Sequence, residues 1–476
     1  MYTLDDKNPS IKTISSLQGI GNFYDIRLNN ITSQIEGIHD QVVEEELTEP
    51  VIFQKEVFNN FDYDKKIQLT GLKVIDLLFP IVEGSKTGIF GGGGVGKTVL
   101  IQELLHSTKR ISKNFINIYM GIGERNREAI ELIDDLKKTG IISNTLGFFG
   151  QMSELPAIRS SIIYSGLTTA EIFRKKYRKN VLLFIDNAYR YVQALTELSI
   201  SLGNKPSFGG YVSSMKKDIA NFQKRINMDA DGSIGSIQTV YVPSDDFTDE
   251  AVFELSSHFE SKLLLDRSIA SKGRYPAINL TKSSSINLKE DLVGKKHFDI
   301  ANKTLSTLAK YEQIKEIVEI VGVSQLSENE RKLYRIARQL ENYFTQNYSS
   351  AEIFTGRKGY VSNIENTIKD VERILLGEFS NIPPLYFLYI KTVEDALETF
   401  SNKDIVEKNS NSSYRNMSET TFISLKKEYK NDLSDFEKTK EIILDQSNKP
   451  KFIKEKSDHK DFKKLYKKIQ SIKNKK

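Results

Sequence analysis

The segment GGGGVGKT, residues 91–98, has the residue types and the spacing that bind phosphate. Gly91, Gly96, Lys97 and Thr98 fill the fixed positions of the Gly-x-x-x-x-Gly-Lys-Thr pattern, between a strand-like run and a helix-like run. Backbone N–H groups of such a loop surround phosphate oxygens, and the following helix adds partial positive charge. We expect Lys97 to reach the β- and γ-phosphates and Thr98 to ligate Mg²⁺. The residues expected to contact the nucleotide here are Gly91, Gly92, Gly93, Gly94, Val95, Gly96, Lys97, Thr98 and Val99.

An acidic residue closes the most apolar run of the chain, VLLFI at residues 181–185. Asp186 follows this run directly, so it would lie at the carboxyl end of a buried strand, facing the same crevice as the phosphate loop. A carboxylate at that place is the expected second anchor for Mg²⁺, through water. The purely structural alternative is an N-cap for the next helix.

The segment GIGERNRE, residues 121–128, brings a further acid and base to a strand end. Hydrolysis of ATP needs a group that orients or deprotonates water, and positive charge on the transferring phosphoryl group. Glu124 suits the first task and Arg125 the second. A Glu-Arg pair alone is more often a surface ion pair, and its place after the phosphate loop favours the catalytic interpretation.

Strand-like and helix-like segments alternate from Lys86 onward. Expected strands are 87–91, 116–123, 144–150, 181–187 and 236–246, and expected helices are 97–110, 126–138 and 156–177. Continuous apolar strands between amphipathic helices indicate an α/β fold with a parallel sheet covered on both faces. We divide the chain into a short N-terminal segment (1–67), a nucleotide-binding domain (68–296), a helical C-terminal domain (297–400) and a Lys-rich extension (401–476).

Composition excludes several classes of protein. The 476 residues include no cysteine, so disulfides, zinc–thiolate sites and cysteine nucleophiles are excluded, and five scattered histidines argue against a histidine-rich metal site. No apolar run has the ~18 residues of a membrane span, and no signal peptide is evident. We therefore expect a cytoplasmic protein.

The formal charge of +5 is concentrated in the extension. Residues 401–476 carry a net +8, and the other 400 residues carry −3. Helical spacing places five apolar side chains of the extension on one face, with lysines around them. These five are Phe462, Leu465, Tyr466, Ile469 and Ile472. This face could dock on the same or a neighbouring subunit, or bind an acidic partner, an anionic membrane or nucleic acid. Nucleic acid is the weakest of these interpretations, because the other 400 residues carry a net negative charge.

The motifs together resemble those of the catalytic β subunit of F-type rotary ATPases. The phosphate-loop region GLKVIDLLFPIVEGSKTGIFGGGGVGKTVLIQEL (71–104) is similar to the family almost residue for residue. In the family's order follow GERNRE (123–128), LLFIDNAYRYVQALTELSISLGNKPSFGGY (182–211), SIQTVYVPSDDFTDEA (236–251), RYPA (274–277) and AEIFTG (351–356). The resemblance covers about residues 60–400 and implies a RecA-like phosphate-loop NTPase core.

The resemblance implies roles in hydrolysis at matching positions. Glu124 would be the catalytic glutamate, where the non-catalytic sister subunit has glutamine. Arg125 and Arg190 would contact the phosphate region. Thr98, Glu128 and Asp186 would organise Mg²⁺ and its waters.

The resemblance also implies a site for the base of ATP or ADP. Tyr275 and Phe354 would sandwich the adenine, with Tyr348 and Ala351 beside it. Aromatic faces are suited to hold a base by stacking.

The same resemblance implies partners. Family members form a ring of alternating catalytic and non-catalytic subunits around a central shaft, and the non-catalytic α-type neighbour supplies an arginine finger. The resemblance also implies a peripheral protein at the inner face of the cell membrane. An arginine finger is worth ~10³–10⁵ in rate, so the chain alone should hydrolyse ATP poorly.

Three features depart from the family pattern. The family's N-terminal β-barrel of roughly 80 residues does not fit before Gly91, so we expect a truncated barrel. The acidic lever loop corresponds to SQLSENE (324–330), in which only Glu328 and Glu330 are acidic. The Lys-rich extension is additional. These departures resemble variant F-type-like ATPases of wall-less bacteria, which are linked to cell-surface or motility machinery.

The sequence is also compatible with other functions. A β subunit of a proton-coupled synthase and an export-type ATPase of a secretion system share the phosphate loop. An inactive structural ring member would bind nucleotide without turnover. A nucleic-acid helicase ring is supported only by the basic extension.

Overall fold

The computed structural model describes residues 10–14, 20–25, 31–32, 46–50, 65–108, 115–207, 209–352 and 356–401. The amphipathic helix predicted for the extension and Phe354 lie outside the described residues. No helix within the described ranges combines the length and the apolar character that crossing a bilayer requires.

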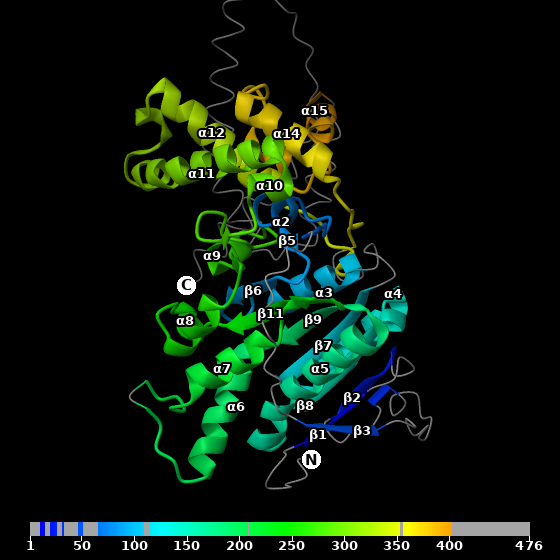
Figure 1. The fold of residues 1–476 in the computed structure, drawn as a ribbon. Coiled ribbons are helices and arrows are strands. Elements are labelled where there is room, and N and C mark those ends of the chain that lie inside the picture. The colour runs from blue at the N-terminus through cyan, green and yellow to red at the C-terminus, as the bar shows by residue number, and fades with distance from the viewer. Residues whose placement is uncertain are drawn as a thin grey trace, which may run out of the picture. The chain divides into compact units, whose positions relative to one another are not determined.

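A largely parallel sheet forms the centre of the nucleotide-binding domain (Figure 1). Its strands are arranged in the order β13-β12-β6-β11-β9-β7-β8-β2, and every neighbouring pair from β12 to β2 is parallel. The short strands β13 and β10 add antiparallel pairs to β12 and β11. The bounds are β2 (Phe23–Asp25), β6 (Lys86–Gly91), β7 (Phe115–Glu124), β8 (Thr145–Gln151), β9 (Asn180–Asp186), β10 (Met228–Asp229), β11 (Gly232–Tyr241), β12 (Ser261–Leu264) and β13 (Ser284–Ser285).

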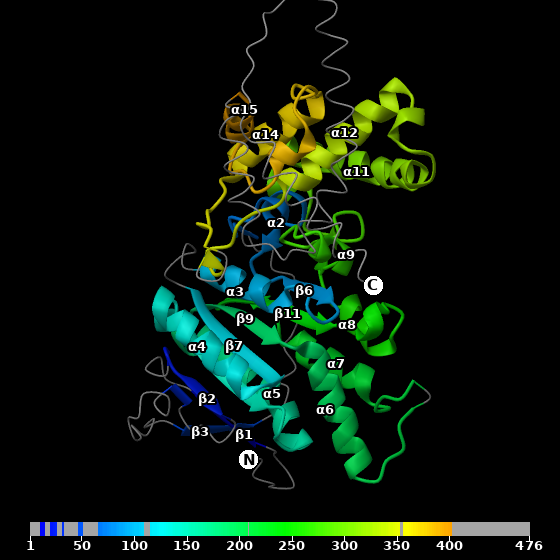
Figure 2. The same cartoon turned by 180° about the vertical axis from the view of Figure 1, so that it is seen from behind.

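Helices cover both faces of this sheet, as the uninterrupted apolar strands require (Figures 1 and 2). Successive side chains of a strand point to opposite faces, so Ile89 and Phe90 enter separate cores. The first core includes α3 (Lys97–Ser107) and α4 (Asn126–Thr139). The second core includes α5 (Pro156–Tyr177), α6 (Ala188–Ser201), α7 (Met215–Lys224) and α8 (Glu250–Ser257). This α/β core with a helical C-terminal domain confirms the predicted fold class.

The N-terminal segment adds β2 to the outer edge of the sheet, beside β8. Gly147 on β8 makes this possible, because a Cβ at this position would lie only 1.9 Å from the Phe23 ring. Strands β1 (Ser10–Ile14) and β3 (Glu46–Pro50) pair antiparallel. Among the described residues before position 65, these strands form no closed barrel.

Helices dominate after residue 290. They are α10 (Glu290–Val293), α11 (Lys295–Val321), α12 (Glu328–Tyr343), α14 (Ile364–Leu376) and α15 (Val393–Ser401). Ser327 and Glu330 form a reciprocal capping box that starts α12. The remaining elements are α2 (Lys73–Leu78), α9 (Arg267–Ser271) and the small sheet of β4 (Ile67–Gln68) and β5 (Ile81–Val82), and α2 packs against α11 and α14.

The predicted elements are present in the structure, with three differences at their ends. The helix expected at 97–110 ends at Ser107, and the strand expected to start at residue 236 begins at Gly232. The strand expected to reach residue 246 ends at Tyr241. Pro243 lacks a backbone donor, and Ser244 and Asp245 have φ angles of 54° and 57°, which turn the chain out of the sheet. The domain boundaries drawn after residues 67, 296 and 400 stay predictions.

Gln346, in the loop after α12, ties the two domains together. Its buried side chain accepts a hydrogen bond from the Lys73 N–H (3.0 Å). The same amide donates to the carbonyls of Gly71 and Tyr360, both at 2.8 Å. All these groups are buried or half-buried, so loss of one partner would leave the others unsatisfied.

Lys73 is a fully buried cation at this junction. Its ammonium donates to the Ile390 carbonyl (2.8 Å) and lies 4.0 Å from the centre of the Tyr343 ring. Burial lowers the pKa of Lys73 to about 7, and the negative charges of Asp370 and Asp395 limit the decrease.

We expect this lysine to make folding pH-dependent. The folded-state pKa lies below the unfolded value, so the unfolded chain binds more protons above pH 7 and the free energy of unfolding rises with pH. The increase should be about 2 kcal/mol between pH 7 and pH 9. Urea unfolding of the wild type and Lys73→Met across this range measures it, with the exposed Lys296→Met as control. An equal slope in Lys73→Met would contradict the assignment.

Candidate functional site

The phosphate loop connects β6 to α3 in the centre of the sheet. Gly96 precedes α3 with a φ of 92°, a left-handed conformation that favours glycine. Gly93 and Gly94 are exposed, and a Cβ at either would meet no atom within 4 Å. The loop therefore presents an open, side-chain-free surface at a helix N-terminus, which fits a chain of phosphates.

Lys97 is folded back onto this loop. Its ammonium donates to the carbonyl oxygens of Gly91 (2.7 Å) and Gly92. Burial lowers the pKa of Lys97 to about 8, while the negative charge of Asp186 opposes this. Thr98 and Val99 are exposed on the first turn of α3, so the Thr98 hydroxyl is accessible to a cation.

Asp186 is buried at the end of β9, where it links three strands. It accepts hydrogen bonds from the hydroxyls of Thr239 on β11 and Tyr119 on β7 (3.3 Å for Tyr119). Burial raises the pKa of Asp186, and these hydrogen bonds together with Lys97 and Arg190 oppose the increase. The helix N-cap that the sequence left open as an alternative falls on Asn187, whose side chain accepts from the Tyr189 N–H (2.9 Å).

Glu124 ends β7 on the same edge of the sheet. Its carboxylate lies 3.4 Å from the guanidinium of Arg190, which also donates to the Gly123 carbonyl. Burial raises the pKa of Glu124 to about 9, and the charge of Asp186 adds to the increase. The pKa of the exposed Glu128 is lowered, chiefly by its hydrogen bond with Glu124. The more deeply buried Glu124 therefore holds the proton.

No group of three His, Cys, Asp or Glu in the described ranges could hold a metal ion by itself. A Mg²⁺ ion at this site would need phosphate oxygens in addition to Thr98, Asp186 and Glu128. This donor set of hydroxyl and carboxylate oxygens fits Mg²⁺, which is usually bound by one or two carboxylates plus substrate phosphates.

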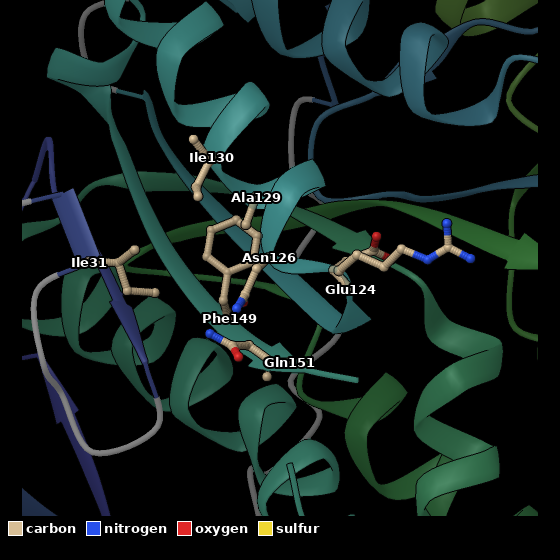
Figure 3. Close-up of a pocket in the computed structure, with 9 residues that line it drawn as sticks. Ile31, Glu124, Asn126, Ala129, Ile130, Phe149 and Gln151 are labelled. Carbon is tan, nitrogen blue, oxygen red and sulfur yellow. The ribbon is translucent and has the colours of Figure 1, made fainter. Parts of the chain in front are cut away.

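Arg125 differs from the other predicted groups in its position. It is the exposed N-cap of α4 and lines a cavity of about 430 Å³ beside Glu124. Figure 3 shows Ile31 at one side of this cavity and Glu124 at the other, with Phe149 and Ala129 between them. Arg125 is thus open to contact from outside the chain.

The predicted base site lies next to the phosphate loop. The half-buried Tyr275 ring approaches Gly96, 3.5 Å from where a Cβ of that glycine would lie. Tyr348 is buried and Ala351 half-buried in a loop whose Ser350 N–H donates to Glu103 on α3 (2.8 Å). The structure thus brings Tyr275, Tyr348 and Ala351 close to the helix that begins in the phosphate loop.

Two residues beside the phosphate loop received no predicted role. Asp245 and Arg267 form an ion pair (3.2 Å) that covers Gly92, where a Cβ would lie 2.2 Å from the Asp245 carboxylate. The signal in the sequence is the run VPSDD directly after an apolar strand. Tyr119 and Thr239 are also site residues that the sequence does not predict, because strand alternation alone does not identify which side chains reach Asp186.

The fold and the site together define a phosphate-loop nucleotide-binding domain joined to a helical domain. Residues 71–285 match the ATP synthase alpha/beta family, nucleotide-binding domain. Residues 287–380 match the C-terminal domain of V and A type ATP synthase. The chain thus contains regions similar to both domains of an ATP synthase subunit.

A solved structure supports the fold. The chain is similar to a unique ATP synthase subunit, NeqB, from Nanoarcheaum equitans, with a TM-score of 0.66 and 24% sequence identity. The match covers 77% of this chain and 86% of that chain. At this identity the likeness concerns the fold alone.

Nucleotide affinity should fall as pH rises above 8. Lys97 loses its proton there in the free protein, whereas a bound phosphate would favour the charged form, so binding takes up a proton. We expect the Kd for ADP without Mg²⁺ to rise by up to about tenfold per pH unit between pH 8 and pH 9.5. Calorimetry measures the Kd in the Glu124→Gln variant, because the Glu124 carboxyl group, which would also titrate in this range, is then absent.

The matched variant carries Lys97→Met in addition to Glu124→Gln. It should bind ADP more weakly at pH 7 and show no such dependence. A slope that persists without Lys97 would assign the titration to another group.

Proposed function

We propose that the chain is the catalytic, ATP-hydrolysing subunit of a rotary ATPase ring. The observation that carries this proposal is the half-buried Glu124 carboxyl at the end of β7, 3.4 Å from the Arg190 guanidinium and on the same edge of the sheet as Asp186 and the phosphate loop. A nucleotide-binding subunit without turnover has no need of this carboxyl group. The matches of both domains to ATP synthase families support the wider assignment.

In the proposed reaction the phosphate loop and Lys97 bind the phosphates of ATP. Bound Mg²⁺ would neutralise charge on the phosphate oxygens. Glu124 must lose its proton before it can accept one from water, and Glu128 is hydrogen-bonded to it on the exposed side. Glu128 therefore offers the route by which the proton leaves. Arg190 then holds the ionised Glu124 in place.

Other subunits of the proposed ring would complete the site. An α-type sister subunit would contribute an arginine finger, and the exposed Arg125 beside Glu124 lies where contact from outside the chain is possible. A central shaft subunit would receive the mechanical work that ATP hydrolysis provides. The Lys-rich extension would bind a further partner or membrane-associated machinery at the inner face of the cell membrane.

The type of ring has two candidate answers. The sequence motifs favour an F-type-like ATPase, for which we propose a cell-surface or motility machine in preference to proton-coupled synthesis. The match of residues 287–380 to V and A type ATP synthases favours the other branch. Purification of the native complex and identification of its subunits distinguishes them, because a proton-channel sector would oppose the motility proposal.

Glu124→Gln should lower Mg-ATP hydrolysis by the native complex by about 10²–10⁴-fold, because a positioned general base contributes this much. Binding of ATP should persist, since the amide keeps the shape of the carboxyl group. The control is Glu131→Gln on the exposed side of α4, where Glu131 pairs with Arg127 (2.7 Å). Turnover by Glu124→Gln at the wild-type rate would refute the catalytic role.

A further inference from the structure

Tyr389 reaches from the helical domain to the backbone of the loop that carries Tyr275. Its hydroxyl accepts a hydrogen bond from the Tyr275 N–H (3.1 Å) and donates to the Gly273 carbonyl. One hydroxyl therefore fixes the backbone on both sides of Arg274. Tyr389 itself follows the turn at Pro384–Phe387 and precedes α15.

Tyr389 is held firmly enough to act as a support. Its own N–H donates to the Thr345 hydroxyl (2.7 Å), and its φ of 56° is uncommon for a residue other than glycine. The Arg357 guanidinium lies 5.4 Å from the centre of its ring. Burial raises the pKa of Tyr389 to about 12, so the hydroxyl keeps the proton that it donates to Gly273.

Tyr275 is also held from its other side. Its carbonyl accepts a hydrogen bond from the Gln346 N–H (2.8 Å), so both backbone groups of Tyr275 bind to the helical domain. The Tyr275 ring projects toward Gly96 of the phosphate loop and stays half-buried. The backbone is thus fixed by one domain while the ring is available at the site of the other.

We propose that Tyr389 is a positioning residue for base recognition, which holds the Tyr275 ring where the base of a bound nucleotide stacks. This inference rests on the proposed nucleotide site and adds a residue to it. Tyr389 acts through Tyr275 and has no role in holding phosphates. Its effect is therefore confined to ligands that carry a base.

A comparison of two ligands separates this role from a purely structural one. ATP has the base and the triphosphate, whereas inorganic tripolyphosphate has the phosphates alone. A variant that damages the fold weakens both, while loss of ring positioning weakens ATP only. Tyr389→Phe keeps the ring and removes the hydroxyl.

We expect Tyr389→Phe in the full-length chain to raise the Kd for Mg-ATP about three- to tenfold, because this is the effect of losing one or two hydrogen bonds. The Kd for tripolyphosphate should stay within about twofold of wild type. Tyr386→Phe is the matched control, because its ring packs edge-on against Phe400 at 5.3 Å. Tyr275→Ala shows how far the affinity for ATP falls when stacking on this ring is removed completely.

A fluorescence measurement gives a second test. The chain has no tryptophan, so Tyr275→Trp introduces a single reporter at the base site. ATP should quench this reporter and tripolyphosphate should not. Addition of Tyr389→Phe should reduce the quenching at saturating ATP.

The outcomes separate the two proposals. Failure of the wild type to bind either ligand would overturn the proposed function and this inference with it. If the wild type binds both ligands, three results overturn the inference alone: an unchanged ATP affinity in Tyr389→Phe, an equal loss for both ligands, or an unchanged ATP affinity in Tyr275→Ala.

Discussion

The burial of one carboxylate, Asp186, sets the electrostatics of the whole site. Thr239 and Tyr119 hydrogen-bond to it from the neighbouring strands, so the carboxylate joins β7, β9 and β11 at the edge where their chains leave the sheet. Burial is the main cause of the raised pKa of Glu124 and of the lowered pKa of Lys97; the charge of Asp186 adds to the first shift and limits the second. A charge with little water around it acts strongly over such distances. One acid thus acts on the pKa of a second acid and on the pKa of a base.

The proposed base site depends on both domains. The sheet supplies the phosphate loop, and the helical domain holds the backbone of Tyr275 through Gln346 and Tyr389. Gln346 also binds Gly71 and Lys73 in the segment that leads into the sheet. A displacement of the helical domain would therefore change the position of the Tyr275 ring directly, without passing through the sheet. In the proposed ring, this arrangement would couple occupancy of the proposed base site to the position of the helical domain.

The sequence predicts the groups that stand at strand ends and leaves out those that arrive by tertiary contact. The phosphate loop, Glu124 and Asp186 follow recognisable apolar strands, and parallel strands bring their ends to one edge. Resemblance alone indicates Arg190, because nothing in its helix marks it. Tyr389, Thr239 and Asp245 come from segments far along the chain, and local patterning carries no signal for their partners. The strand expected to reach residue 246 shows the same limit, since its end depends on a turn at Ser244 and Asp245.

The strand β2 has a consequence for the solubility of the molecule. It covers the outer edge of β8, and the ring of Phe23 fills the space above Gly147. Without it, the backbone donors and acceptors of β8 would be open to another chain, and uncovered edges of this kind lead to association between sheets. With β2 in place the sheet ends in a strand of only three residues, and short edge strands are one way in which proteins limit association between sheets. Any shortened version of the protein should keep β2.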